Sequence, residues 1–306
     1  MRVIIAGGSG FLGRQLARRC VDAGHDVIIL TRTVNPAVPF KQLEWDGKTL
    51  GQWTEALTEI GPVAVANLAG KLVDCRPTAS NIAALRTSRV DATRVLVLAS
   101  QLRKEPVSHW LQASTTAIYS DAGELHLDEL SDLPSPGLPQ MTGVAAAWEA
   151  ALEGANTTSK TILRTSIVLA QGCPAWDRLT LLVRWGVGGT VGRGQQWTSW
   201  IHIEDWLRIA MVALGLDPQL AAPQGVVVAS SPHPVRNREL MATLRSHLGR
   251  RGIPTPSALV TLGAIVLRTD PALALTGRFV TSTVLKDAGF TFRYPDLDTA
   301  VTHILG

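Results

Sequence analysis

The chain has 306 residues, of which 46% are hydrophobic and 18% are charged, and this composition excludes a disordered protein. Its length fits one large α/β unit or a domain with an appendage. The net charge of +4 is scattered, without a basic run interleaved with aromatic residues, so we expect no nucleic-acid partner.

Cysteine usage and apolar stretches bear on the compartment of the protein. The three cysteines, Cys20, Cys75 and Cys173, are odd in number, and none lies in a Cys-x-x-Cys pair. With no secretory leader, this pattern predicts a reducing, cytoplasmic setting. The apolar stretch 257–267 falls well below the roughly 20 residues that a membrane span needs, so we expect no membrane partner.

The first 30 residues predict a strand–helix–strand unit. The apolar run 3–6 is typical of a strand buried on both faces of a parallel sheet. Apolar residues then recur every four positions over 12–20, as in an amphipathic helix, and Gly24 is placed to end it. The run 27–30 repeats the buried-strand pattern.

Strands and helices continue to alternate, which predicts an α/β fold with a Rossmann-type doubly wound parallel sheet. Past Pro232 the chain reads as mostly helical. We therefore expect a Rossmann domain over 1–230, with a substrate-loop insertion around 172–205, and a small C-terminal closing lobe over 231–306. Further strands are expected at 43–45, 63–68, 110–114, 162–169 and 226–229, and helices over 79–102 and around 148–152.

Gly7, Gly10 and Gly13 form a Gly-x-x-Gly-x-x-Gly turn between the first strand and the first helix. Small residues let the backbone approach a pyrophosphate, whose charge then lies on the N–H groups at the helix N-terminus. The alternative is a turn that serves helix–sheet packing alone. The strand before it and the helix after it favour a dinucleotide site.

Arg32 bears on which dinucleotide is bound. NAD sites usually place an acidic residue after the second strand to take the ribose 2′-hydroxyl. Here Arg32 stands there, with no carboxylate beside it. A guanidinium matches a phosphate with two hydrogen bonds, so the sequence predicts NADP (NADPH), with Arg14 in a position to assist. The alternative is that Arg32 is a solvated loop residue.

Several stretches beyond the glycine turn carry a family resemblance, and 196–203 (Gln-Trp-Thr-Ser-Trp-Ile-His-Ile) is the most specific. With them the chain resembles the short-chain dehydrogenase/reductase superfamily, and more closely its atypical extended branch, the epimerase family proteins. The resemblance covers nearly the whole chain. The other matching stretches are 67–70, 88–90, 148–149, 163–169, 237–239, 287–290 and 294–297.

The resemblance implies where a cofactor lies, at the carboxyl ends of the predicted strands, where an open α/β sheet binds ligands. The implied residues are Gly7, Ser9, Gly10, Phe11 and Leu12 at the pyrophosphate, Arg32 at the 2′-phosphate, Asp46 with Trp45 near the adenine, Asn67, Leu68, Ala69 and Gly70 under the ribose, and Ser114 with Arg164 and Thr165 on the nicotinamide side.

The chain departs from the superfamily at its usual catalytic motif. Hydride chemistry there runs on Tyr-x-x-x-Lys with a Ser or Thr, where the tyrosine is the general acid/base and the lysine lowers its pKa and holds the ribose. Aligning Glu149 with the acidic residue that follows this motif puts Met141 at the tyrosine position and Ala145 at the lysine position. Neither can move a proton.

Three functional interpretations stay open. The chain is a reductase or a nucleotide-sugar-type epimerase/dehydratase with a rebuilt site, in which Ser114 or Thr115 polarises a carbonyl and Tyr119, Glu149 or His202 handles the proton. It is instead a non-catalytic NADP(H)-binding regulator or redox sensor. Or it reduces only substrates for which a solvent proton suffices. Each candidate residue also has a purely structural interpretation.

The glycine-, glutamine- and tryptophan-rich stretch 188–197 is the best candidate for a substrate loop, because glycines permit a hinge and tryptophans can stack on a ring or sugar. We take Gln196, Trp197, Trp200 and His202 as candidate substrate residues, with a core or interface aromatic cluster as the alternative. The substrate is expected to be small and carbonyl- or sugar-like, and either a monomer or a homodimer is possible.

Other charged and metal-binding features are weaker. Arg86 and Arg89, one turn apart on the predicted helix 79–102, can reach an anion, but a solvated helix face is the simpler interpretation. The seven histidines are dispersed without metal-ligand spacing, so no metal is expected.

Overall fold

The computed structural model of the chain describes residues 1–266 and 268–306, so the last residue of the apolar stretch 257–267 lies outside the described residues. Its centre is a seven-stranded sheet in the order β11-β7-β5-β4-β1-β2-β3, and every neighbouring pair is parallel. From β1 the chain builds outward first to one side and then to the other, which confirms the predicted doubly wound Rossmann-type fold. The strands are β1 (Arg2–Ala6), β2 (Asp26–Thr31), β3 (Lys41–Glu44), β4 (Val63–Asn67), β5 (Val107–Thr115), β7 (Thr157–Thr165) and β11 (Gly225–Ala229).

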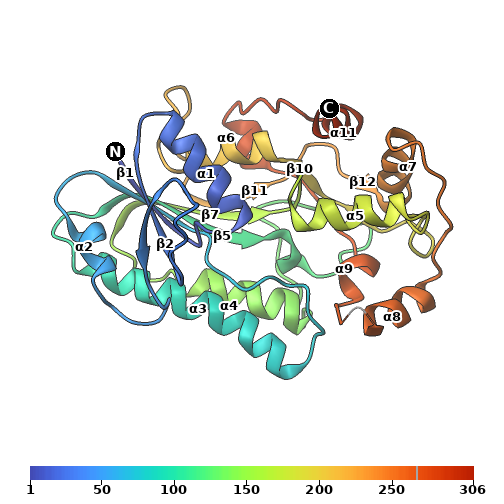
Figure 1. Cartoon of the computed structure of the whole chain (residues 1–306), viewed down its shortest axis with the longest axis horizontal. Helices are drawn as coiled ribbons and strands as arrows, with labels where there is room; N and C mark the ends of the chain where they lie inside the picture. The colour runs from blue at the N-terminus through green and yellow to red at the C-terminus, as the bar shows by residue number, and fades with distance from the viewer. Residues whose placement is uncertain (267) are drawn as a thin grey trace.

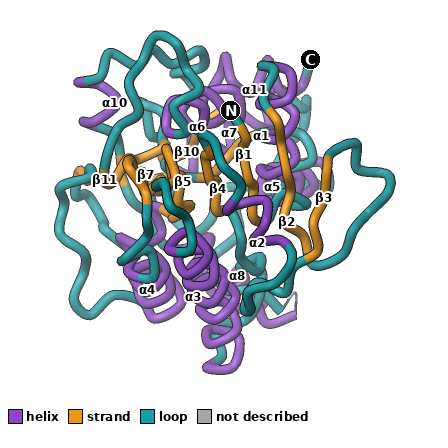
Figure 2. Tube along the Cα trace, turned by 90° about the vertical axis from the view of Figure 1, so that its left-hand side faces the viewer, coloured by secondary structure: helices purple, strands orange, loops and turns teal. Residues whose placement is uncertain are grey.

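Helices cover both faces of this sheet (Figures 1 and 2). The first strand shows why, because its alternate side chains enter two different cores: Val3 and Ile5 pack with Leu16 of α1, whereas Ile4 packs with Leu96 of α3. The helices are α1 (Phe11–Asp22), α2 (Trp53–Thr58), α3 (Ala79–Gln101), α4 (Val144–Ala150), α5 (Pro174–Arg184), α6 (Ile203–Ala213), α7 (Asn237–His247), α8 (Ser257–Val266), α9 (Ala272–Leu275), α10 (Thr283–Asp287) and α11 (Leu297–Leu305), with a 3-10 turn at Thr116–Tyr119 and a π-helical turn at Pro139–Gly143.

Three short strand pairs lie outside the central sheet. The strand predicted within 162–169 is confirmed as the end of β7, but β7 ends at Thr165 and a second, separate strand follows. Ser166 turns the chain there by donating its N–H and its hydroxyl to the Ala229 carbonyl, at 3.0 and 2.8 Å. The pairs are β8 (Ile167–Leu169) with β10 (Trp200–His202), β9 (Trp197–Thr198) with β12 (Val235–Arg236), and β6 (His126–Leu127) with β13 (Phe279–Val280).

Of the helices after β11, α7, α8, α9 and α11 lie toward one end of the molecule, with α8 and α9 near each other and α7 beside α11 (Figure 1), whereas α10 lies near β11 (Figure 2). The segment 172–205, expected to be a loop insertion, contains α5, β9 and β10. Of the helices in the described ranges, none combines the length and the apolar character that crossing a bilayer requires.

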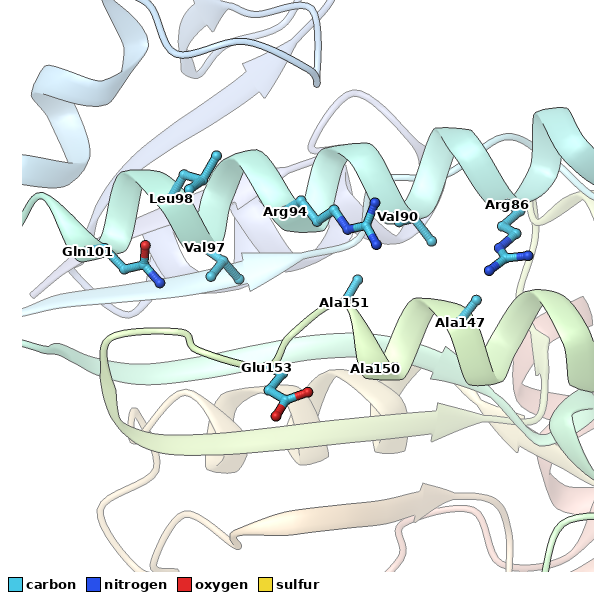
Figure 3. Close-up of a pocket in the computed structure, with 10 residues that line it drawn as sticks. All are labelled: Arg86, Val90, Arg94, Val97, Leu98, Gln101, Ala147, Ala150, Ala151 and Glu153. Carbon is cyan, nitrogen blue, oxygen red and sulfur yellow. The ribbon is translucent and has the colours of Figure 1, made fainter.

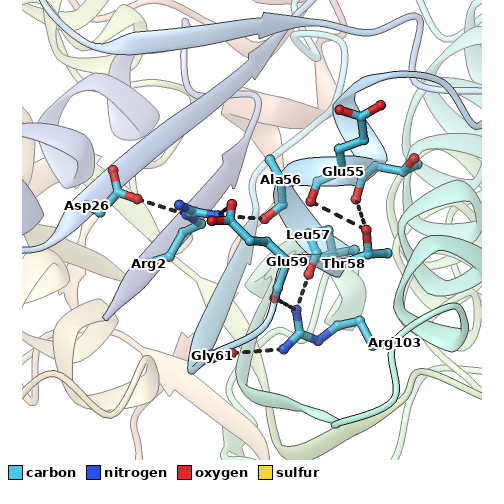
Figure 4. A network of polar contacts seen from close by, with 10 residues as sticks. Arg2, Asp26, Glu55, Ala56, Leu57, Thr58, Glu59, Gly61 and Arg103 are labelled. Atoms are coloured by element: carbon cyan, nitrogen blue, oxygen red, sulfur yellow. Dashed lines mark hydrogen bonds and ion pairs between the residues drawn. The ribbon is translucent and has the colours of Figure 1, made fainter.

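The amino ends of the central strands are tied together by charged side chains (Figure 4). Arg2 on β1 donates to Asp26 at 2.8 Å and pairs with Glu59 beyond α2. The hydrogen bond with Glu59 raises the pKa of Arg2. Arg103 reaches the carbonyls of Glu59 and Gly61 at 3.0 and 2.9 Å. These contacts hold together the amino-terminal ends of the strands, opposite the carboxyl ends where the glycine turn lies.

Candidate functional site

The glycine turn lies at the carboxyl end of β1 and is closed against the loop that follows β4. Gly7 has a φ of +75°, which favours glycine, and a Cβ there would lie 2.7 Å from the Leu68 carbonyl oxygen. A Cβ on Gly13 would lie 2.5 Å from the Gly7 carbonyl oxygen. Two of the three motif glycines are therefore required by close approach of backbone to backbone.

The first turn of α1 is open to an anion. Gly10 is its N-cap in an extended conformation, no side chain caps the helix, and no acidic residue lies in its first turn. The N–H groups and the positive end of the helix dipole are thus left for a ligand. Arg14 donates to the Ser9 carbonyl and braces the turn, and the side chains of Phe11 and Leu12 are half-buried. A diphosphate fits this cradle.

Arg32 stands exposed immediately after β2. Within residues 1–266 and 268–306 its guanidinium makes no ion pair and no hydrogen bond, so it is available to a phosphate. Asp46, beyond β3, is engaged locally: its carboxylate accepts from the N–H groups of Lys48 and Thr49, each at 2.8 Å. The hydrogen bond from the Thr49 N–H lowers the pKa of Asp46 most, followed by that from Lys48.

Asn67 shapes the loop 68–70 from inside the protein. Its side chain is fully buried, its Oδ1 accepts from the Ala69 N–H at 3.2 Å, and its Nδ2 donates to Thr93 and Gln112 at 2.9 and 3.0 Å. The side chain therefore holds the loop, and the loop itself is the part left to face a ligand.

The three catalytic candidates, Ser114, Tyr119 and Glu149, are brought into one hydrogen-bonded network by Arg164. Ser114 on β5 donates to Glu149 Oε1 at 2.5 Å, and Arg164 on β7 donates to both oxygens of Glu149 at 2.9 and 2.8 Å. Arg164 Nη1 also donates to the Tyr119 hydroxyl at 2.8 Å, and that hydroxyl donates to the Asp128 carbonyl at 2.5 Å.

The network and its burial set the charges of Tyr119 and Arg164. Burial raises the pKa of Tyr119 and outweighs the opposing charge of Arg164, so the phenol stays protonated. Burial by itself lowers the pKa of Arg164, but the hydrogen bonds and charge of Glu149 reverse this, so the pKa of Arg164 is raised and the guanidinium stays charged. Tyr119 is thus held by Arg164 as a protonated phenol, and Glu149 is engaged by the same guanidinium.

The positions aligned with the missing motif are apolar and closed. Met141 lies in the π-helical turn before α4 and Ala145 in the first turn of α4, and both are buried. The described residues of this region therefore give the Ser114 hydroxyl no phenol or ammonium partner of the usual kind.

The candidate substrate residues do not converge on a ligand-facing surface. Trp200 is fully buried and donates to the His233 carbonyl at 3.1 Å. Trp197 packs edge-on against Phe279, and the guanidinium carbon of Arg236 lies 3.8 Å from its ring centroid. Gln196 Nε2 donates to the Ala274 carbonyl at 2.9 Å, tying the stretch to the C-terminal region. Because Trp200 is fully buried, it belongs to an aromatic core cluster rather than to a surface that contacts substrate.

His202 is an N-cap. Its Nδ1 accepts from the Glu204 N–H at 3.0 Å at the start of α6, its Nε2 lies 3.2 Å from Nδ1 of His303, and its ring packs on Tyr294 with centroids 4.0 Å apart. The side chain is buried rather than half-buried, and burial, with the nearby His303, lowers the pKa of His202 to about 4. Because both ring nitrogens are engaged, these contacts favour a structural role for His202, and its role as a substrate residue stays a prediction.

A cavity of about 440 Å³ lies between α3 and α4 (Figure 3), away from the glycine turn. Arg86 points into it and is exposed, as expected. Over the described ranges no group of three His, Cys, Asp or Glu side chains is arranged to hold a metal ion. The residues lining the cavity are Arg86, Val90, Arg94, Val97, Leu98, Gln101, Ala147, Ala150, Ala151 and Glu153.

The exposure of Arg89 differs from what the sequence pattern predicts. The pattern puts Arg89 on a solvated helix face with Arg86, but its side chain is half-buried between the loop after β4 and Trp148 of α4. The signal for this was the spacing of buried residues along α3, since Leu85, Ala92 and Leu96 set the inner face and Arg89 falls between them.

Comparison with known proteins agrees with this geometry. The family model described as NAD dependent epimerase/dehydratase matches residues 3–229. The chain belongs to that family. A second model, a domain of unknown function (DUF1731), matches residues 255–304 of this epimerase-family chain.

Relatives of this epimerase-family chain match it end to end. The epimerase family protein SDR39U1 of Bos taurus is 30% identical, with 100% of both chains covered. A crystal structure of the human protein SDR39U1 (isoform 2) with NADPH has a TM-score of 0.85 at 28% identity, covering 99% of each chain. A nucleoside-diphosphate sugar epimerase from Corynebacterium glutamicum has a TM-score of 0.78 at 27% identity, covering 100% of this chain and 58% of that one.

Proposed function

We propose that this chain binds NADPH and acts as a reductase or an epimerase/dehydratase on a small carbonyl- or sugar-like substrate. The observation that carries the proposal is the glycine turn at the uncapped start of α1, with the exposed guanidinium of Arg32 after the next strand. Support comes from the human relative, whose structure contains NADPH, and from the Corynebacterium relative, which is named a nucleoside-diphosphate sugar epimerase.

In the proposed complex the backbone of the turn holds the diphosphate and Arg32 holds the 2′-phosphate. The stretch Asn67–Gly70 lies under a ribose, Asp46 borders the adenine, and Ser114 with Arg164 lies on the nicotinamide side. When bound, NADPH supplies a nicotinamide that can donate a hydride. The chain itself supplies the phosphate contacts, the orientation of the ribose and a hydroxyl beside the reacting carbon.

Ser114 is the proposed contact to substrate. Ser114 Oγ donates its proton to Glu149 Oε1, 2.5 Å away, so in this arrangement the serine oxygen accepts a hydrogen bond from a substrate hydroxyl rather than donating one to a carbonyl. Tyr119 and Glu149 are both bound by Arg164, and the buried Tyr119 phenol keeps its proton. We infer that a proton consumed by the substrate comes from water, which fits substrates that need no strong general acid.

A second candidate function is a non-catalytic NADP(H)-binding regulator or redox sensor. The observation that favours it is the saturation of the Ser114–Glu149–Arg164–Tyr119 network, in which every candidate for proton transfer already has its partners. This network and the apolar residues Met141 and Ala145 are equally suited to a protein that only holds the dinucleotide.

The proposal also covers the roles of the two parts of the chain, its compartment and its partners. The sheet-bearing part, 1–230, holds the cofactor, and 231–306 closes over the substrate. The three thiols of Cys20, Cys75 and Cys173 are free, which supports a reducing, cytoplasmic compartment. The proposed partner is a small molecule and neither a nucleic acid nor a membrane, and the chain functions as a monomer or a homodimer.

The test is to mix the purified protein with NADPH and follow absorbance at the nicotinamide band across a library of aldehydes, ketones and nucleotide sugars. An enzyme oxidises NADPH, or interconverts a sugar with catalytic dinucleotide, with at least one compound. Tight NADPH binding with no turnover of any compound would favour the regulator, and no binding would remove both functions.

A further inference from the structure

Arg89 is a cation without a carboxylate partner. Its Nη1 donates to the Leu85 carbonyl at 3.0 Å and its Nη2 to the Lys71 carbonyl at 2.9 Å. Its guanidinium carbon lies 5.0 Å from the Trp148 ring centroid. Among the described residues it forms no ion pair, and burial lowers the pKa of Arg89 to about 10. A guanidinium has five N–H donors, and these contacts use two.

Two other enclosed arginines in the described part of the chain are better satisfied. Arg164 has both oxygens of Glu149 and a phenol, and Arg103 has the carbonyls of Leu57, Glu59, Gly61 and Glu105. Arg278, by contrast, has one hydrogen bond, to the Thr276 hydroxyl at 3.1 Å. A partly buried charge with donors to spare is costly unless an acceptor completes it. Arg89 is therefore left short of acceptors.

A second donor beside Arg89 is also without an acceptor. Trp148 is buried, and in the described part of the chain its indole N–H has no hydrogen-bond partner. The indole N–H is enclosed by protein and out of a ligand's reach, so Trp148 offers the guanidinium a ring face but no acceptor. Arg89 therefore still calls for a group that accepts, such as a hydroxyl, carboxamide or phosphate oxygen.

The position of Arg89 relative to the sheet indicates which half of a bound dinucleotide would lie beside it. Gly70 lies directly on it: a Cβ on Gly70 would be 3.1 Å from the guanidinium carbon. The loop that contains Gly70 follows β4. Trp148 lies on α4, directly before Glu149, which accepts a hydrogen bond from Ser114 of β5. Arg32 follows β2, on the other side of β1 in the sheet. A dinucleotide centred on the turn after β1 thus has its adenosine toward Arg32 and its nicotinamide toward Arg89.

We propose that Arg89 binds the nicotinamide half of NADPH, donating from its free N–H groups to the hydroxyls of the nicotinamide ribose. This inference rests on the proposed NADPH binding and adds a binding residue to it. Gly70 gives the guanidinium access to the ligand because it has no side chain, and the hydrogen bond to Lys71 fixes the loop and the arginine in one arrangement.

The test compares two ligands by calorimetric titration: NADPH, and 2′,5′-ADP, which carries the adenosine half and its 2′-phosphate alone. Arg89→Met is expected to weaken NADPH binding about tenfold and 2′,5′-ADP binding by less than about twofold, the effect of one charge-assisted hydrogen bond. Arg86→Met, one turn away on the same helix and exposed, is the matched control and is expected to leave both affinities unchanged. Arg32→Ser is expected to weaken both ligands alike.

The outcomes separate the two levels of the claim. Wild-type protein that does not bind NADPH overturns the proposed function itself. Wild-type protein that binds NADPH, with Arg89→Met equal to it or weakened equally for both ligands, overturns the role of Arg89 while leaving the function standing. If Arg89→Met does not fold, Arg89→Lys takes its place: a selective loss for NADPH supports the role, and an unchanged ratio of the two affinities refutes it.

Discussion

Arg164 and Glu149 form a two-point ion pair between β7 and α4, with Nε and Nη2 donating to opposite carboxylate oxygens at 2.9 and 2.8 Å. Only 7% of the arginine side chain and 12% of the glutamate side chain are exposed. Because a buried charge left without its partner is costly, this pair fixes how α4 sits against the sheet and where Ser114 points.

Replacing Glu149 by Gln should lower the free energy of unfolding by about 3 kcal/mol, because it leaves the buried Arg164 charge uncompensated. Urea unfolding measures this. Glu149→Gln with Arg164→Met should be less destabilised than Glu149→Gln alone, and Glu59→Gln, at an exposed ion pair, should change little. A single variant as stable as wild type would show that the pair is not needed.

Replacing Arg32 by Asp should shift the preference from NADPH toward NADH. The carboxylate repels the 2′-phosphate and accepts from a 2′-hydroxyl, so NADPH affinity should fall at least about tenfold. Titration with both dinucleotides measures the ratio. Arg18→Asp, the same charge change at an exposed site farther along α1, is the control, and an unchanged ratio in Arg32→Asp would mean that another residue reads the phosphate.

Replacing Gly13 by Ala should abolish NADPH binding and destabilise the protein by roughly 1–3 kcal/mol, because the new Cβ meets the Gly7 carbonyl oxygen at 2.5 Å and neither backbone can yield freely. Thermal unfolding and a binding titration check both effects. Gly143→Ala is the matched control: a Cβ there meets nothing within 4 Å, and its backbone is helical, so stability should be kept or raised.

His202 should make the free energy of unfolding fall as the pH is lowered. The folded imidazole stays neutral down to a pKa of about 4, while in the unfolded chain it takes up a proton near its ordinary value of 6.5. The unfolded state thus binds more protons between these values, so stability is fully present above about pH 6.5 and falls as the pH drops to 4, by about 3 kcal/mol at most.

The variant His202→Asn keeps an N-cap acceptor for α6 and should lose this part of the pH dependence. Unfolding free energies at pH 7 and pH 4.5 give the comparison, with His233→Asn, an exposed histidine, as the control that should retain it. Equal slopes in wild type and His202→Asn would assign the acid sensitivity to other groups.

With a substrate identified by the library, Ser114→Ala should lower kcat with little effect on NADPH affinity, because the proposed function gives the Ser114 hydroxyl a contact to the substrate. Tyr119→Phe should lower stability more than rate, since it leaves the Asp128 carbonyl and Arg164 each short of a partner. A Tyr119→Phe variant that is stable and inactive would instead make the phenol the proton donor.

The first 115 residues show how far sequence patterns reach. Strands β1, β2 and β4 and helices α1 and α3 follow from uninterrupted apolar runs, four-residue spacing and glycine stops, all of which are local signals. The same signals put the glycine turn where the structure has it. The stretch 162–169, which is predicted to contain a strand, holds the end of β7 and all of β8, because Ser166 bonds to Ala229, a contact across 63 residues that no local pattern contains.

The sequence predicts which residues lie in the candidate site better than it predicts their burial and hydrogen bonds. Ser114, Tyr119 and Glu149 do come together, but the sequence gives no sign that Arg164 binds Glu149 and Tyr119 at once. His202 reads as an alternating strand residue, whereas its role as N-cap depends on the helix that begins after it. Burial and hydrogen-bond saturation depend on segments far apart in the chain.

The most direct test of the account is a calorimetric titration of the wild-type protein with NADPH and with NADH. The open first turn of α1 and the exposed Arg32 predict one site that binds NADPH at least about tenfold more tightly than NADH. No heat with either dinucleotide, or a tighter complex with NADH, would contradict it.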